Sequence, residues 1–203
     1  MSAHTQAPID VEVLRGEIQK TYTEVSTKPE QEFIFPTGRP WAEALAYPAE
    51  LLEAIPAANV GAFAGVANPW VHGAAMPGER VLDLGCGGGT DALVAAQMVG
   101  PSGHVTGIDM TPAMLALARA GAAEMGLQNV ELIEAMVEAP PLADACVDLV
   151  ISNGVIDLLP DKDAVFEEIV RVLRPGGRLQ IADVVIHHEV SEDARKNIDL
   201  WTG

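Results

Sequence analysis

The sequence predicts an α/β protein with a mostly parallel sheet and helices on both faces of that sheet. From residue 79 onward, short apolar segments alternate with helical segments, and this alternation implies crossover connections between parallel strands. Residues 81–91, VLDLGCGGGTD, place a glycine-rich loop directly after the first apolar segment. Open parallel sheets bind ligands beyond the carboxyl ends of their strands, so this loop marks the expected ligand site.

The first 75 residues predict a helical cap instead of a second domain. Apolar side chains at helical spacing indicate a first helix, and prolines and glycines interrupt the chain after it. The expected elements are a helix over 11–25, a turn at 36–40, two short helices within 41–56 separated by Pro48, and a loop over 61–70. We therefore expect a cap or lid over residues 1–75 and a ligand-binding domain over residues 76–203.

The main domain is expected to alternate strands and helices to its end. The predicted strands are 80–84, 104–109, 130–134, 147–152 and 178–186, and the predicted helices are 91–99, 112–125, 164–173 and 192–201. Thr111 and Pro112 are typical of a helix start, whereas Gly126 and the RPGG sequence at 174–177 are typical of helix ends. The local signals therefore agree with the alternating pattern.

Composition narrows the possible classes of function. The chain has 203 residues, 49% of them hydrophobic, and its net charge of −17 disfavours nucleic acid and anionic membrane surfaces as partners. No apolar run is long enough to span a bilayer, and residues 1–10 lack the features of a signal peptide. Cys86 and Cys146 suggest neither a disulfide framework nor a metal site. We expect a cytoplasmic protein without a bound metal.

Two carboxylates flank the glycine loop. Asp83 precedes it, in a strand expected to be buried, and a buried carboxylate needs a partner. It would be unfavourable beside a pyrophosphate, whereas a ligand with an ammonium and a sulfonium group would compensate it. The loop follows G-x-G-x-G and not the G-x-G-x-x-G of dinucleotide sites. Asp109, at the end of the second strand, can accept hydrogen bonds from ribose hydroxyls, and Met110 can contact an adenine ring.

The glycine loop, the acid in GIDM at 107–110 and the RVLRPGG sequence at 171–177 resemble the class I S-adenosylmethionine-dependent methyltransferases, which have a Rossmann-like fold. More narrowly, residues 99–119 and 150–185 resemble the arsenite methyltransferase group, and the likeness extends over residues 36–203. The resemblance implies S-adenosylmethionine as cofactor and S-adenosylhomocysteine as product.

The resemblance also implies roles for individual residues. The glycine loop would support the methionine part of the cofactor, Asp109 would bind the ribose, Met136 and Val137 would border the adenine, and Asn153 would lie near the methionine end. The implied cofactor-binding residues are Asp83, Gly85, Cys86, Gly87, Gly89, Asp109, Met110, Met136, Val137 and Asn153.

Three features depart from that group. Soft thiolates bind trivalent arsenic, but Val66 and Gly154 stand where the group places two cysteines, and a third would follow Gly203. Met136 stands where many relatives have an aspartate for the adenine amino group, which would reduce cofactor affinity. The chain also ends after the fifth strand of a fold whose sheet usually has seven. We expect either a truncated form of a longer protein or a homodimer whose second copy covers the sheet edge.

The sequence assigns no catalytic residue, because methyl transfer depends mainly on positioning and exclusion of water. If the acceptor must lose a proton, Asp183, His187 or His188 is the candidate base, with structural hydrogen bonding or solvent exposure as the competing roles. Tyr22 either closes over the cofactor or packs in the cap. The leading hypothesis is a methyltransferase for a small-molecule acceptor. A non-catalytic S-adenosylmethionine-binding protein is the alternative, and Asp83 disfavours a nicotinamide-dependent oxidoreductase.

Overall fold

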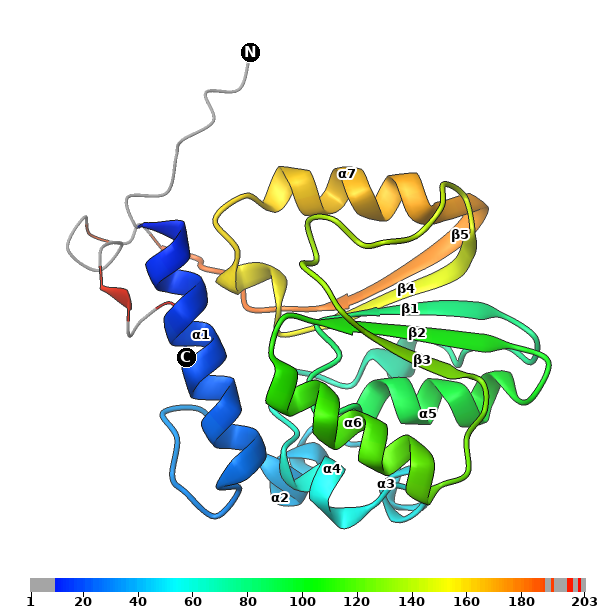
Figure 1. Cartoon of the computed structure of the whole chain (residues 1–203), viewed down its shortest axis with the longest axis horizontal. Coiled ribbons are helices and arrows are strands. Elements are labelled where there is room, and N and C mark those ends of the chain that lie inside the picture. The colour runs from blue at the N-terminus through cyan, green and yellow to red at the C-terminus, as the bar shows by residue number, and fades with distance from the viewer. Residues whose placement is uncertain (1–9, 189–190, 192–196, 199–200, 202–203) are drawn as a thin grey trace.

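A parallel β-sheet forms the centre of the computed structural model, which describes residues 10–188, 191, 197–198 and 201 (Figure 1). In this part of the chain the strands are β1 Arg80–Leu84, β2 His104–Asp109, β3 Val130–Glu134, β4 Val147–Asn153 and β5 Leu173–Ala182. Their spatial order is β3-β2-β1-β4-β5, and every neighbouring pair is parallel. The strand order therefore reverses between β1 and β4, which is where such sheets bind ligands.

Helices cover both faces of the sheet. α5 (Thr90–Val99) and α6 (Pro112–Glu124) pack on one face, and α7 (Lys162–Val172) packs on the other (Figure 1). Successive residues of β1 point to opposite faces, so Val81 belongs to the core under α5 and Leu82 to the core under α7. The fold class predicted from the sequence is confirmed.

The residues before β1 form a helical cap. Its helices are α1 Val11–Thr27, α2 Gly38–Ala44, α3 Ala49–Glu53, α4 Ala57–Gly61 and the 3-10 helix η1 Pro69–His72. The carboxylate of Asp10 caps α1 by accepting the backbone N–H of Glu12 at 2.9 Å. From there α1 runs across the carboxyl ends of the strands (Figure 1). The position of the domain boundary at residue 75 stays a prediction.

One prediction for the cap is wrong. α1 ends at Thr27, so the turn predicted at 36–40 does not end this helix. Thr37 and Gly38 instead begin α2, with Pro40 in its first turn, where the missing N–H of proline costs no helical hydrogen bond. The two short helices predicted on either side of Pro48 are present as α2 and α3, and α4 is an additional helix that the sequence did not predict.

The start of β5 also differs from its prediction. The strand begins at Leu173, directly after α7, so the RPGG sequence at 174–177 does not end the helix. The RPGG sequence lies within a register shift between β4 and β5. Val147 pairs with Leu173, whereas Leu149 pairs with Arg178. The glycines therefore accommodate extra residues in the strand.

The end of β5 comes at Ala182 and not at residue 186. The carboxylate of Asp183 accepts the backbone N–H of Val184 at 2.8 Å, and this contact takes a donor that a longer strand would use. Residues 184–186 are consequently exposed. Most of the helix predicted at 192–201 lies outside the described residues. No helix in the described part of the chain is both long and apolar enough to cross a membrane.

Candidate functional site

A cavity of about 1030 Å³, including the space at its mouth, lies at the carboxyl ends of β1, β2 and β4. Its floor is the glycine loop between β1 and α5, α1 lies over it, and cap residues 62–65 close one side. Open parallel sheets bind their ligands at this place. The switch point of the sheet is therefore hollow.

Three glycines of the loop have left-handed backbone conformations, with φ of 69° at Gly85, 50° at Gly87 and 90° at Gly89. A Cβ atom at Gly85 would overlap the side chain of Val155 in the turn after β4. A Cβ atom at Gly89 would lie 2.8 Å from the Cβ of Ala118 on α6. At Gly87 a Cβ atom would meet nothing within 4 Å, so the backbone is open to a ligand there.

Asp109 ends β2 and orders the glycine loop. Its Oδ2 accepts the backbone N–H of Gly87 at 2.9 Å, and its Oδ1 accepts that of Thr111 at 2.7 Å. Burial raises the pKa of Asp109, although these hydrogen bonds oppose the change. Each carboxylate oxygen can accept a second hydrogen bond, so Asp109 can also receive hydroxyl groups from the cavity.

Asp83 lies on β1 beside Asp109, and only 3% of its surface is exposed. Its Oδ2 atom has no hydrogen-bond partner among the described residues. Burial raises the pKa of Asp83 well above its usual value, and the charges of Asp91 and Asp109 raise it further. A ligand that brought positive charge into the cavity would compensate this carboxylate.

Asp91 lies in the first turn of α5 and is also buried, but it has three side-chain donors. The hydroxyl of Tyr47 lies 2.8 Å from Oδ1, the indole N–H of Trp70 donates to Oδ1 at 3.0 Å, and the amide of Asn153 donates to Oδ2 at 3.0 Å. Burial raises the pKa of Asp91, and the three donors oppose this. Sequence reasoning missed this residue, because acids are common in the first turn of a helix and its partners are distant in sequence.

Asn153 ends β4 and lines the cavity, but its amide is bound by the cap. Its Oδ1 accepts the backbone N–H of Val66 at 2.8 Å and of Ala67 at 3.3 Å, and its Nδ2 donates to the carbonyl of Ala67 at 2.8 Å. A Cβ atom at Gly65 would overlap this amide. Asn153 therefore fixes one cap segment to the sheet.

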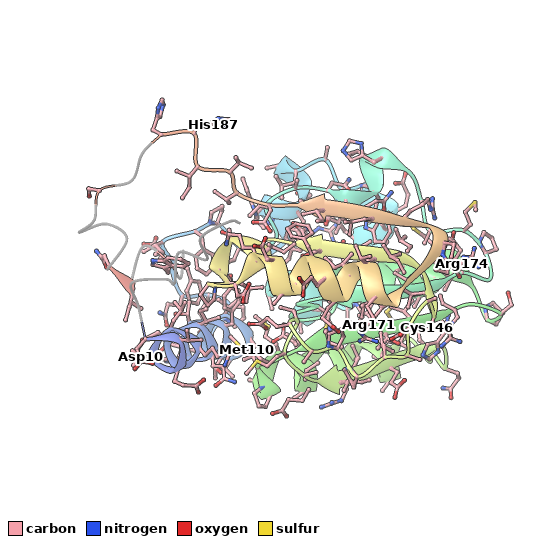
Figure 2. All side chains as sticks on the ribbon, turned by 90° about the horizontal axis from the view of Figure 1, so that it is seen from above. Asp10, Met110, Cys146, Arg171, Arg174 and His187 are labelled. Carbon is pink, nitrogen blue, oxygen red and sulfur yellow. The ribbon has the colours of Figure 1, made fainter. Side chains whose placement is uncertain are left out.

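The other predicted cofactor residues lie around the cavity, except for Gly89. Met110 packs against α1, where Gln19 donates to its carbonyl oxygen at 2.7 Å (Figure 2). Gly89 is not among the lining residues and instead allows α5 to pack on α6. The predicted residues that line the cavity are Asp83, Gly85, Cys86, Gly87, Asp109, Met110, Met136, Val137 and Asn153.

Comparison with known proteins agrees with this geometry. Residues 75–202 match the family described as "Methyltransferase domain". The chain belongs to this family. A relative of the methyltransferase domain is the arsenite methyltransferase of Halobacterium salinarum, which is 48% identical over 139 residues, covering 68% of this chain and 36% of the relative. The arsenite methyltransferase of Homo sapiens is 41% identical over 132 residues, or 60% of this chain and 35% of the relative.

Solved structures resemble the methyltransferase domain as well. CrArsM, an arsenic (III) S-adenosylmethionine methyltransferase from Chlamydomonas reinhardtii, matches with a TM-score of 0.60 and 39% identity over 78% of this chain and 53% of that chain. A SAM dependent methyltransferase from Aquifex aeolicus matches with a TM-score of 0.52 and 29% identity over 59% of this chain and 65% of that chain. The resemblance to class I S-adenosylmethionine-dependent methyltransferases is confirmed. The chain spans about a third of the length of the curated relatives named above.

The cavity of the methyltransferase domain fits S-adenosylmethionine, the cofactor of this family. The unpartnered oxygen of Asp83 suits a ligand with an ammonium and a sulfonium group. The space above Gly87 allows a ligand to approach the backbone, and Asp109 retains acceptor capacity for hydroxyl groups. The polar atoms and the open backbone therefore match the chemistry of the cofactor.

Val66 and Gly154 meet beside the cavity of the methyltransferase domain. A Cβ atom on Gly154, whose φ is 71°, would lie 3.2 Å from Cγ1 of Val66. The structure thus brings together the two positions where the resemblance to arsenite methyltransferases places cysteines. The cysteines of this chain lie elsewhere: Cys86 is buried in the glycine loop, and Cys146 lies near Arg171, far from the α1 end of the molecule (Figure 2).

The candidate bases Asp183, His187 and His188 are not among the residues that line the cavity. Asp183 accepts two backbone N–H groups of the turn after β4, at 2.9 and 3.1 Å, which is a structural role. His187 and His188 are exposed, and His187 lies away from the body of the protein (Figure 2). Tyr22 does line the cavity, and its ring stacks on Phe35 with centroids 5.8 Å apart.

Proposed function

We propose that this protein transfers a methyl group from S-adenosylmethionine to a small-molecule acceptor. The observation that carries the proposal is the buried Oδ2 atom of Asp83, which lacks a partner among the described residues and belongs to the cavity that Asp109 and the glycine loop also line. A turn with only a structural role would leave this oxygen without a partner. A ligand with positive charge explains why an acid stands there.

The cofactor would be held by groups at the ends of β1, β2 and β3. Asp109 would accept the ribose hydroxyls while it keeps the loop in place, and Asp83 would face the positively charged part. The glycine loop would lie against the methionine part. Met110, Met136 and Val137 would border the adenine, and all three line the cavity.

When bound, S-adenosylmethionine supplies a methyl group on a sulfonium that a nucleophile can displace directly. The chain contributes positioning and exclusion of water. Leu14, Ile18 and Tyr22 of α1 cover the cavity, and Asn153 holds the cap segment that closes its side. A nucleophile with a free electron pair then needs no base from the protein.

The first test is calorimetric titration of the protein with S-adenosylmethionine and, separately, with S-adenosylhomocysteine. We expect micromolar binding, and Asp109→Ala should weaken it at least tenfold because both the loop and the ribose contact are lost. The matched control is Asp144→Ala, whose carboxylate is exposed and pairs with Arg171. Absence of binding by both ligands would refute the proposal.

A non-catalytic S-adenosylmethionine-binding protein is the second candidate. The contact of Val66 with Gly154 favours it, because no thiol stands at either position where arsenite methyltransferases would bind their acceptor. The two candidates differ in turnover. Formation of S-adenosylhomocysteine with any acceptor supports the enzyme, whereas tight cofactor binding with no turnover over a broad acceptor panel supports the binding protein.

We also infer that a second copy of the chain covers the free edge of β5. This strand pairs only with β4 among the described strands, and Leu179, Val185 and Ile186 are exposed on it or just beyond it. Sedimentation of the wild-type protein should give a dimer. Val185→Lys should shift it to a monomer, and Ile34→Lys, at an exposed position in the loop after α1, should not.

A further inference from the structure

One wall of the cavity has no part in the proposed cofactor site. It is formed by α1, by cap residues 62–65 and by the turn after β4. The acceptor has to approach from this wall, because the groups proposed to hold the cofactor occupy the ends of β1, β2 and β3. Except for Arg15 on α1, the larger side chains of the wall are uncharged: Leu14, Ile18, Tyr22, Phe63, Val155 and Leu158.

The charged residues that line the cavity are mostly acidic. The acids are Asp83, Asp91, Asp109 and Glu138, and Arg15 on α1 is the one basic lining residue in the described part of the chain. The guanidinium of Arg15 is already paired with Glu138 at 3.2 Å and with a second glutamate at 2.9 Å. An anionic acceptor would therefore enter a negative field without a free cation to bind it.

Two polar side chains beside the wall, Asn153 and Cys86, offer little to an anion. The amide of Asn153 bonds to the cap and to Asp91, so it offers little to a ligand. Cys86 carries the one thiol among the described lining residues, and burial raises its pKa, which keeps it protonated. Val66 lies against Gly154, which lines the cavity, and adds no polar group there. A thiophilic acceptor finds no thiolate here.

We propose that the acceptor is an uncharged and largely apolar molecule, bound between α1 and the turn after β4 and bordered by the contact of Val66 with Gly154. The proposal rests on the proposed function and adds the chemical class of the substrate. Burial against the uncharged wall would supply the affinity. The acidic lining and the committed polar groups would exclude carboxylates, and the absence of a thiolate from the described wall would exclude arsenite.

The test uses protein saturated with S-adenosylhomocysteine, so that the cofactor site is filled. Calorimetry then compares 2-naphthol, which is uncharged at neutral pH, with 2-naphthoate, an anion of nearly the same shape, and with arsenite. We expect 2-naphthol to bind at least tenfold more tightly than either of the others. Equal or tighter binding of 2-naphthoate or arsenite would overturn the inference, and so would binding of none of the three. Failure of S-adenosylhomocysteine to bind would instead refute the proposed function.

A variant locates the bound molecule. Val66→Asp should weaken 2-naphthol at least tenfold and leave the affinity for S-adenosylhomocysteine unchanged. Val71→Asp is the matched control, because Val71 is 65% exposed on η1, whereas Val66 lies against the lining residue Gly154, and it should change neither affinity. Val66→Ala tests the same contact without a new charge and should weaken 2-naphthol about threefold. Unchanged 2-naphthol affinity in both Val66 variants would overturn the placement.

Discussion

The floor of the cavity and the joint between the cap and α5 each contain a buried carboxylate. The protein supplies hydrogen-bond donors to both oxygens of one carboxylate but not of the other. At the joint, Asp91 accepts hydrogen bonds from Tyr47, Trp70 and Asn153. At the floor, Asp83 has an oxygen with no partner in the described structure. The joint is therefore complete in the protein alone, whereas the floor needs a ligand. For these two carboxylates, the missing partner distinguishes the acid at the ligand site from the acid at the structural joint.

Removing the acid at the joint should have the largest effect. Asp91→Ala leaves the indole N–H of Trp70 and part of the amide of Asn153 buried without an acceptor, and it leaves the hydroxyl of Tyr47 only a long contact of 3.4 Å to the carbonyl of Ala67. The free energy of unfolding should therefore fall by about 3 kcal/mol. Urea denaturation followed by circular dichroism measures the change. Asp163→Ala is the matched control, because Asp163 is exposed in the first turn of α7. A loss as small as that of the control would contradict the structural role of Asp91.

Substitution of the acid at the floor should act in the opposite direction on stability. Asp83→Asn keeps the shape of the side chain and removes an uncompensated buried charge, so the ligand-free protein should gain about 1 kcal/mol at pH 8. S-adenosylmethionine should bind at least tenfold more weakly, because its positive charge loses a partner. Denaturation and calorimetry on the same preparation give both quantities. A variant that loses stability while it keeps full affinity would reverse the roles of Asp83 and Asp91.

The same two residues show how far sequence reasoning reaches. Asp83 could be predicted as a site residue because an acid inside an apolar strand is conspicuous, and Asp109 because it ends the next strand. Asp91 could not, since its partners Tyr47 and Trp70 lie in a cap whose packing no local pattern reveals. The alternation of apolar and helical segments was enough for the parallel sheet. The end of β5 was missed because it depends on one tertiary hydrogen-bond group, the carboxylate of Asp183.

Cofactor binding should be linked to proton release at the floor. The pKa of Asp83 in the ligand-free protein is raised, so below that pKa the carboxyl is protonated, and a positively charged ligand favours the ionised form. S-adenosylmethionine should therefore release protons on binding and bind more tightly as pH rises toward the raised pKa. Titrations in two buffers of different ionisation enthalpy count the protons. S-adenosylhomocysteine, which lacks the sulfonium, should release fewer, and Asp83→Asn should release none from this site. Equal release by wild type and Asp83→Asn would assign the protons to another group.

The smallest effect on stability is expected at Asp157. This residue is intermediate between Asp83, which has an unpartnered oxygen, and Asp91, which has donors to both oxygens. Its Oδ1 has no partner among the described groups when ionised, but a proton on Asp157 can be shared with Asp183. Burial, and then the neighbouring Asp183, raises the pKa of Asp157 to about 7. Because this folded pKa exceeds the unfolded value of about 3.9, stability is present at low pH and is lost as pH rises from about 4 to about 7.

Asp157→Asn supplies a permanent donor to Asp183 in place of that proton. Its melting temperature should equal that of the wild type near pH 4 and exceed it by a few degrees at pH 8, a modest gain because the side chain is only partly buried. Asp161→Asn, at the exposed cap of α7, controls for the loss of one negative charge from an acidic protein. A gain of the same size at pH 5 and pH 8 would mean that the two carboxyl groups do not share a proton. In that case the unpartnered oxygen of Asp157 would belong with that of Asp83, as a group that only a ligand completes.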